Sequence, residues 1–192
     1  RTAQDRRQSQ RDIRDRVIQS LTNPISKHFY QKHMCQRMLP SVPRDWMNTV
    51  KNVFLIRHPA RVIASFGAKY EDFGLADIGF SQQLELFEML RAESHTPLVI
   101  DSADIREEPE PMLTKLCTAL DLSFDPAMLS WPKGGHPSDG VWAAHWYNAV
   151  HSSTGFAGPE GPLPVLETEA QQELLAKALP IYERLAAHKL AP

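Results

Sequence analysis

Residues 51–66 read KNVFLIRHPARVIASF, and this stretch decides the fold that the sequence predicts. Its first half holds a continuous apolar run, which is typical of a strand that is covered on both faces of a parallel sheet. Pro59 follows soon after, and proline is favoured in the first turn of a helix because its missing N–H needs no partner there. The stretch therefore predicts a buried strand over 51–57 and a helix over about 59–69.

Further strands and helices alternate on both sides of this stretch. Residues 28–34 form a plausible strand with imperfect alternation, and residues 97–101 form a short buried one. Residues 130–164 are rich in Gly, Pro and Trp and are expected to be mainly loop. Helices are expected over 5–22, over 81–93 with Ser81 as N-cap, over 111–122, and over 166–189 with a kink or a break at Pro180. This alternation indicates an α/β fold with a largely parallel central sheet flanked by helices.

The composition excludes several classes of protein. With 192 residues, of which 42% are apolar and 23% charged, the chain suits one ordinary globular domain. No apolar run reaches the ~18 residues that a membrane helix needs, and the net charge of −2 argues against bulk nucleic-acid binding. Cys35 and Cys117 are too few for a disulfide framework and favour a reduced, cytoplasmic protein. The spacing of histidines and cysteines predicts no metal site.

A candidate anion site lies where the central strand passes into the following helix. In open α/β sheets ligands bind at the carboxyl ends of the strands, and a helix N-terminus favours a phosphate or a sulfate. Arg57 can add a bidentate clamp. Arg61 and Ser65 are four residues apart and share one helix face, where a cation and a hydroxyl suit a phosphate monoester. The alternative is that Arg57 pairs with a carboxylate and that Ser65 is a small packing residue.

Lys32 and His33 end the strand that is plausible over 28–34. If this strand lies beside the central one, its carboxyl end faces the same crevice. Lys32 could then neutralise charge on a bridging oxygen, and His33 could take a proton from an attacking hydroxyl. Neighbouring side chains of a strand point to opposite faces, so we do not expect both to act in one pocket. The alternative is a solvated strand end.

Two later segments are candidates for lining the site. Lys133 and Gly134 belong to a flexible basic loop, in which glycine lets the backbone approach a ligand closely. Trp142, Trp146 and Tyr147 place three large aromatic rings in a short stretch, which suits the wall of a substrate pocket. Aromatic residues more often belong to a core, so a role in sealing the base of the domain is the alternative.

The run from Val53 to Phe66 resembles the 3′-phosphate-binding motif of sulfotransferases. In that motif a hydrophobic strand is followed by Arg, then Pro, and then Ser eight residues after the Arg. Arg57 and Ser65 match its two phosphate ligands position for position.

Other segments follow in the order expected for that family. Residues 29–32 resemble the strand of that family that ends in a Lys. Residues 99–122 resemble the segment in which a strand is followed by Glu or Asp, then Asp-Leu, and then a helix. Residues 139–156 are similar to a signature of bacterial sulfotransferase-like proteins. Lys133 and Gly134 stand where the family often uses a Lys-Gly loop to complete the 3′-phosphate site.

The resemblance implies a three-layer P-loop-type fold that binds 3′-phosphoadenosine 5′-phosphosulfate. The sulfuryl group would pass to a hydroxyl or an amine of a small molecule, in a single sulfotransferase-like domain over 1–192. Arg57 and Ser65 would hold the 3′-phosphate and Lys32 would lie near the acceptor. In the family the catalytic His often stands two residues after that Lys, whereas His33 follows it directly. The alternatives are another P-loop enzyme, such as a small kinase, or an inactive nucleotide-binding relative.

The loop that holds the 5′-phosphosulfate in this family, which is rich in Ser, Thr, Arg and Lys, does not occur in the 192 residues. We expect it upstream of the helix over 5–22. The chain is accordingly predicted to be the carboxyl-terminal part of a longer protein.

Overall fold

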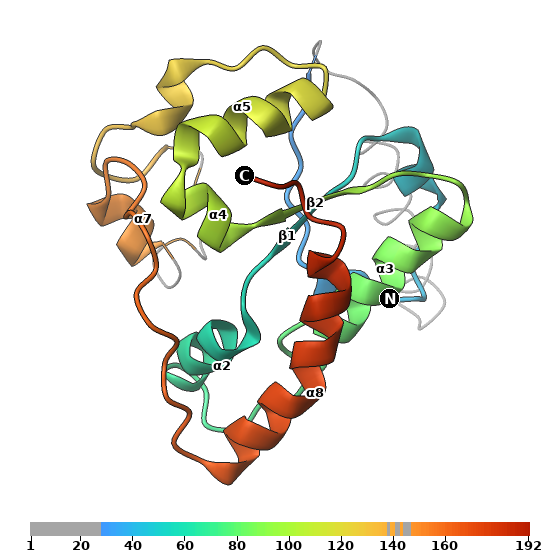
Figure 1. Ribbon diagram of the computed structural model, residues 1–192, viewed down its shortest axis with the longest axis vertical. Coiled ribbons are helices and arrows are strands. Elements are labelled where there is room, and N and C mark those ends of the chain that lie inside the picture. The colour runs from blue at the N-terminus through green and yellow to red at the C-terminus, as the bar shows by residue number, and fades with distance from the viewer. Residues whose placement is uncertain (1–27, 138, 141–142, 144–146) are drawn as a thin grey trace, which may run out of the picture.

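A parallel pair of strands lies at the centre of the molecule, with helices around it (Figure 1). The computed structural model describes residues 28–192, apart from 138, 141–142 and 144–146. The helix predicted over 5–22 lies outside the described residues. Within them the chain is a mixed α/β structure, as the alternation of elements predicted, with a small parallel sheet of two strands. None of the described helices is long and apolar enough to cross a membrane.

The two strands are β1 (Val53–Ile56) and β2 (Leu98–Asp101), and they confirm the central strand and the one expected over 97–101. Their register sets Ile56 beside Asp101, so that the two carboxyl ends lie side by side. At the other edge of β2, the N–H of Leu190 donates to the carbonyl of Val99 at 2.8 Å. The segments that leave β1 and β2 consequently start from one end of the sheet.

β1 is covered on one face only, which corrects the expectation of a strand buried on both faces. Phe54 and Ile56 are buried, whereas Val53 and Leu55 are 38% and 57% exposed. Successive side chains of a strand point to opposite faces, so this alternation leaves one apolar face open. A continuous apolar run does not distinguish the two cases, because it carries no information on what packs against each face.

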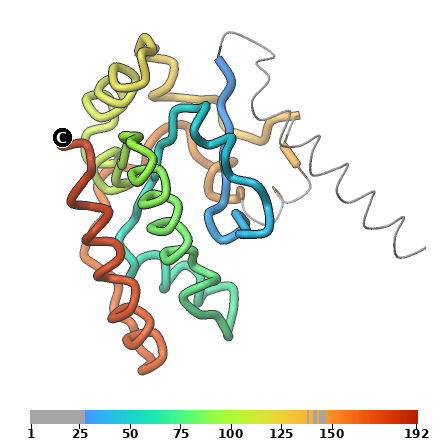
Figure 2. The backbone as a smooth tube through the Cα atoms, turned by 90° about the vertical axis from the view of Figure 1, so that its right-hand side faces the viewer, coloured from blue at the N-terminus to red at the C-terminus, as the bar shows by residue number. Residues whose placement is uncertain are grey.

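The main core lies between the two strands and two helices, α3 (Phe80–Ala92) and α8 (Glu169–Ala186). Figures 1 and 2 show both helices beside the strand pair. Phe54 and Phe87 meet edge to face with ring centroids 5.6 Å apart. The buried cluster consists of Trp46, Met47, Phe54, Ile56, Leu86, Phe87, Leu90, Val99 and Leu185. A smaller cluster joins α2 (Pro59–Gly67) to α8 through Ala60, Ile63, Leu166 and Leu174.

The other elements of the described chain are three 3₁₀ turns and three helices. They are the 3₁₀ turns η1 (Cys35–Arg37), η2 (Asp45–Thr49) and η3 (Pro126–Leu129), and the helices α4 (Ser102–Glu107), α5 (Pro109–Ala119) and α7 (Asn148–Ser152). Residues 130–164 are mainly irregular, as expected. α7 and a single bridge between Ser130 and Gly155 are the regular features described there.

The strand expected over 28–34 is wrong. These residues are irregular, and Phe29 and Tyr30 are 54% and 85% exposed. An imperfect alternation provides no apolar face that a sheet could bury, so β-forming residue types alone do not make a strand here. Lys32 and His33 therefore do not end a strand.

Two helix details also differ from expectation. The N-cap of α3 is Gly79, whose φ of 75° is left-handed, and Ser81 lies inside the helix. Of the kink or break expected at Pro180, the break is absent, since α8 runs without interruption from Glu169 to Ala186. The buried side chains of Ala178 and Leu185 on either side of the proline hold α8 against the core, which compensates for the N–H that proline lacks.

Candidate functional site

α2 begins directly after β1 and fixes the position of the two arginines that the sequence singled out. Its N-cap is His58, whose Nδ1 accepts a hydrogen bond from the N–H of Ala60 at 3.2 Å, and Pro59 opens the first turn. Burial, assisted by the charge of Arg61, lowers the pKa of His58. Arg57 precedes this cap and Arg61 lies one turn into the helix, so both stand at the carboxyl end of β1.

α4 starts in the same way at the end of β2 and brings a third arginine to this edge. Asp101 is 1% exposed, and its Oδ1 accepts from the N–H of Ala103 at 2.9 Å as an N-cap. Its Oδ2 accepts from the hydroxyl of Tyr182 at 2.6 Å. Arg106, in the last turn of α4, was not predicted as a site residue. The sequence signal that could have placed it is Asp101, a favoured N-cap residue at the end of β2, which indicates a helix that carries Arg106.

Arg57, Arg61 and Arg106 converge on the carboxylate of Glu160, and we call these four side chains the guanidinium cluster. Arg57 donates to Oε1 through Nε at 3.1 Å and through Nη2. Arg106 Nη1 lies 2.8 Å from the same oxygen, and Arg61 Nε lies 2.8 Å from Oε2. The alternative in which Arg57 pairs with a carboxylate is thus the arrangement present, and three cations surround that carboxylate.

The carboxylate of Glu160 is almost completely buried, with 4% of its side chain exposed. Burial opposes its ionisation, but the charges of the three arginines prevail and lower its pKa, so the group is a carboxylate at neutral pH. Glu160 escaped sequence reasoning because it lies 103 positions from Arg57 in an irregular segment. Proximity of that kind has no local sequence signal.

The other proposed phosphate ligands differ in their surroundings. Ser65 lies on α2 four residues after Arg61 and is exposed. Lys133 is exposed too, and Gly134 has a φ of 119°, a conformation that favours glycine. The N–H of Gly134 donates to the carbonyl of His151 at 2.8 Å, which ties this loop to α7. Within the described part of the chain, none of these three residues contacts the guanidinium cluster.

The residues expected on the acceptor side are partly brought together. The ammonium of Lys32 lies 5.9 Å from the ring centroid of Tyr147, within the range of a cation–π contact. His33 packs instead against Trp46, with ring centroids 5.1 Å apart, and burial lowers its pKa. Trp142 and Trp146, predicted with Tyr147 to wall the pocket, lie outside the described residues.

A histidine–aspartate pair next to Tyr147 was not predicted. His151 Nε2 lies 3.0 Å from Oδ2 of Asp139, and the ring of His151 meets that of Tyr147 edge to face at 5.9 Å. A hydrogen bond from the backbone N–H of His136 has the largest effect on Asp139 and holds the pKa of its carboxyl below the usual range. The hydrogen bond and charge of His151 act in the same direction. Among the described residues, no group of three His, Cys, Asp or Glu side chains could hold a metal ion.

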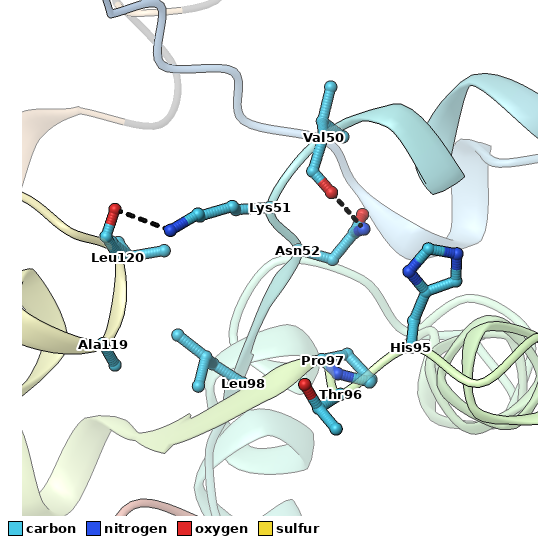
Figure 3. Close-up of a pocket in the computed structure, with 9 residues that line it drawn as sticks. All are labelled: Val50, Lys51, Asn52, His95, Thr96, Pro97, Leu98, Ala119 and Leu120. Atoms are coloured by element: carbon cyan, nitrogen blue, oxygen red, sulfur yellow. Dashed lines mark hydrogen bonds between the residues drawn. The ribbon is translucent and has the colours of Figure 1, made fainter.

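A separate pocket lies at the amino ends of β1 and β2, opposite the guanidinium cluster (Figure 3). Lys51 reaches across it to the carbonyl of Leu120 at 3.0 Å and pairs with Asp121. Asn52 turns back to the carbonyl of Val50 at 3.0 Å. The polar groups of this pocket include one lysine that is paired with an aspartate, whereas the guanidinium cluster holds three cations against one carboxylate and keeps an excess of positive charge. The guanidinium cluster is therefore the better candidate for an anion site.

Comparison with known proteins points to one family. A family model described as a sulfotransferase domain matches residues 7–189. Branched-chain-amino-acid aminotransferase-like proteins 1 and 2 of Arabidopsis thaliana are 34% and 32% identical to the chain over 162 residues. The match covers 84% of this chain and 29% of each relative, so the chain spans under a third of their length. No solved structure matches.

Proposed function

This chain belongs to the sulfotransferase domain family, and from that premise we propose that it is an enzyme dependent on 3′-phosphoadenosine 5′-phosphosulfate. It transfers the sulfuryl group to a hydroxyl or an amine of a small-molecule acceptor. The observation that carries the proposal is the convergence of Arg57, Arg61 and Arg106 at the carboxyl ends of β1 and β2. Guanidinium groups at that edge suit the phosphate of a nucleotide.

The charge of the guanidinium cluster supports a nucleotide phosphate as its ligand. Three guanidinium groups face one carboxylate in the guanidinium cluster, which leaves two positive charges in excess, enough to balance a phosphate dianion. Arg57 is 39% exposed and so accessible from solvent. Ser65, exposed on α2, and Lys133 and Gly134 are proposed as further phosphate ligands on the resemblance to the family alone, since within the described residues none of the three contacts the guanidinium cluster.

The acceptor side rests on Lys32 and the aromatic residues near it. When bound, the nucleotide supplies a sulfuryl group that is already attached to a good leaving phosphate. Lys32, held over the ring of Tyr147, neutralises negative charge on the departing oxygen. His33, which packs against Trp46, is the alternative candidate on this side, and its lowered pKa keeps its imidazole neutral, the form that accepts a proton from an acceptor hydroxyl. Trp142, Trp146 and Tyr147 are proposed to contact the acceptor.

Calorimetry with adenosine 3′,5′-bisphosphate, the nucleotide product, tests the cofactor. Arg57→Ala removes a charge-assisted donor worth about 1.5–3 kcal/mol, so the affinity falls by roughly 10- to 150-fold. Arg37→Ala is the matched control, because Arg37 is an exposed arginine in η1 outside the guanidinium cluster. Equal affinities of the wild type and Arg57→Ala would overturn the assignment.

A transfer assay separates the proposal from its two rivals. Radiolabelled 3′-phosphoadenosine 5′-phosphosulfate is offered with a panel of phenols, alcohols and amines, and label on any acceptor supports sulfuryl transfer. Label transferred only from the γ-phosphate of ATP would favour a small kinase. Nucleotide binding with no transfer to any acceptor would favour an inactive relative.

A further inference from the structure

The guanidinium cluster joins three separate elements that carry like charges. Arg57 leaves the end of β1, Arg61 belongs to α2 and Arg106 to α4. Guanidinium groups that contact one and the same carboxylate lie close together, and they would repel one another if no anion lay between them. In this structure the carboxylate of Glu160 is that anion, and it contacts all three.

The exposed fractions of the side chains show that Glu160 lies deeper in the protein than Arg57. Its side chain is 4% exposed, whereas that of Arg57 is 39% exposed. An anion that arrives from solvent therefore meets Arg57 before it meets the carboxylate. Glu160 contacts Arg57 through the Nε and Nη2 edge, whereas Nη1 of Arg57 makes no hydrogen bond to another described residue.

The segment that carries Glu160 is fixed by contacts that do not involve its carboxylate. We call residues 157–168 the connector, since they link the loop region to α8. Arg106 Nε donates to the carbonyl of Gly158 at 2.8 Å, and Arg61 Nη2 donates to the carbonyl of Gly161. Leu166 is buried in the cluster between α2 and α8. The connector thus holds the carboxylate at a set place.

We propose that Glu160 is a positioning residue of the phosphate site, which gathers Arg57, Arg61 and Arg106 and leaves Arg57 directed toward an incoming phosphate dianion. The inference rests on the proposed function, because it takes the guanidinium cluster as the 3′-phosphate site. Arg106 is the third cation of that site. Glu160 stays in place when the phosphate binds, so two excess positive charges meet two negative ones and the site becomes neutral.

Glu160→Gln tests this inference by calorimetry with two probes, adenosine 3′,5′-bisphosphate and adenosine 5′-phosphate. Without the carboxylate the three guanidinium groups are no longer held together, and we expect the affinity for the bisphosphate to fall about tenfold, the effect of roughly one charge-assisted hydrogen bond lost from the site. The affinity for the monophosphate stays the same, because that nucleotide does not use the guanidinium cluster. A merely structural role would weaken both nucleotides alike.

Two further variants complete the experiment. Glu160→Asp keeps the charge on a shorter side chain and is expected to recover part of the lost selectivity, which also tests the inference if Glu160→Gln does not fold. Glu167→Gln makes the same charge change at an exposed position of the connector and leaves both affinities unchanged.

The outcomes separate this inference from the proposed function. Unchanged or tighter binding of the bisphosphate by Glu160→Gln would show that the carboxylate is irrelevant or competes with phosphate, and would overturn the inference alone. The same holds if Glu160→Asp is as weak as Glu160→Gln. A wild type that does not prefer the bisphosphate to the monophosphate would overturn the proposed function, and the inference with it.

Discussion

Tyr182→Phe removes one oxygen from the contact that anchors α4 beneath the guanidinium cluster. The hydroxyl of Tyr182 donates to Oδ2 of Asp101 at 2.6 Å, and that carboxylate is 1% exposed. The ring of Tyr182 also packs against His58, with centroids 5.4 Å apart, and phenylalanine keeps that ring. The substitution therefore isolates the hydrogen bond from the packing around it.

The expected loss follows from the charge and the burial of the acceptor. A hydrogen bond to a charged group contributes about 1.5–3 kcal/mol, and here its loss leaves a buried carboxylate oxygen unsatisfied. For a domain of this size each kcal/mol lowers the melting temperature by roughly 2–4 °C. Tyr182→Phe should accordingly melt about 3–12 °C below the wild type at pH 8.

The same contact has a pH signature. Burial, and then the hydrogen bond and charge of Asp101, raise the pKa of Tyr182 above its ordinary value of 10.0. Because the folded state favours the protonated phenol, its contribution is fully present below about pH 10 and is lost as the pH rises further. The difference between the wild type and Tyr182→Phe should therefore shrink above pH 10.

Urea unfolding followed by circular dichroism, at pH 8 and in steps above pH 10, measures both effects. Tyr30→Phe is the matched control, because Tyr30 is 85% exposed and should change stability little at any pH. The reasoning is refuted if Tyr182→Phe lies within about 0.5 kcal/mol of the wild type at pH 8, the range of ordinary surface substitutions. A difference that widens above pH 10 would refute the assigned direction of the pKa.

Three more predictions concern the core, the buried acid and the open strand. Leu185→Ala should cost about 2–5 kcal/mol in urea unfolding because Leu185 is fully buried, and Leu163→Ala, at a 49% exposed leucine, serves as its control. The lowered pKa of Glu160 stabilises the fold above the unfolded value of 4.5, so the stability difference between the wild type and Glu160→Gln should shrink as the pH falls below it; a difference that is constant from pH 7 to 3 would contradict this. Leu55→Lys, at a 57% exposed position, should leave the melting temperature nearly unchanged and reduce self-association in light scattering, and a clear fall in melting temperature would mean that this face is covered.

The elements of the fold that could be predicted are those whose cause is local. The apolar runs at β1 and β2, and Pro59 in the first turn of α2, each carry their own signal, and these elements lie where expected. The strand over 28–34 failed because strand formation depends on a partner, and a short run of β-forming residues does not say whether one is present. α8 continues through Pro180 because distant packing outweighs the local loss of one hydrogen bond.

The residues of the candidate site also differ in whether a local sequence pattern could predict their positions. Arg57 and Arg61 were predictable because a strand end and a helix start place them within a few residues of each other. Arg106 required the knowledge that Asp101 caps a helix after β2. Glu160 was out of reach, since its relation to Arg57 exists only in three dimensions. The positions of Arg57 and Arg61 are confirmed, but every proposed ligand or catalytic role stays a prediction: those of Arg57, Arg61, Lys32, His33, Ser65, Lys133, Gly134, Trp142, Trp146 and Tyr147.

The separation of Arg57 and Glu160 along the chain has a consequence in time. During synthesis at about 5–20 residues per second, the 103 positions between them correspond to roughly 5–20 s. From the synthesis of Arg106 onward, the growing chain carries three arginines whose neutralising acid has not yet been made. The guanidinium cluster can close only after the connector has left the ribosome, so a prematurely terminated chain would lack it however well β1 and α2 had formed.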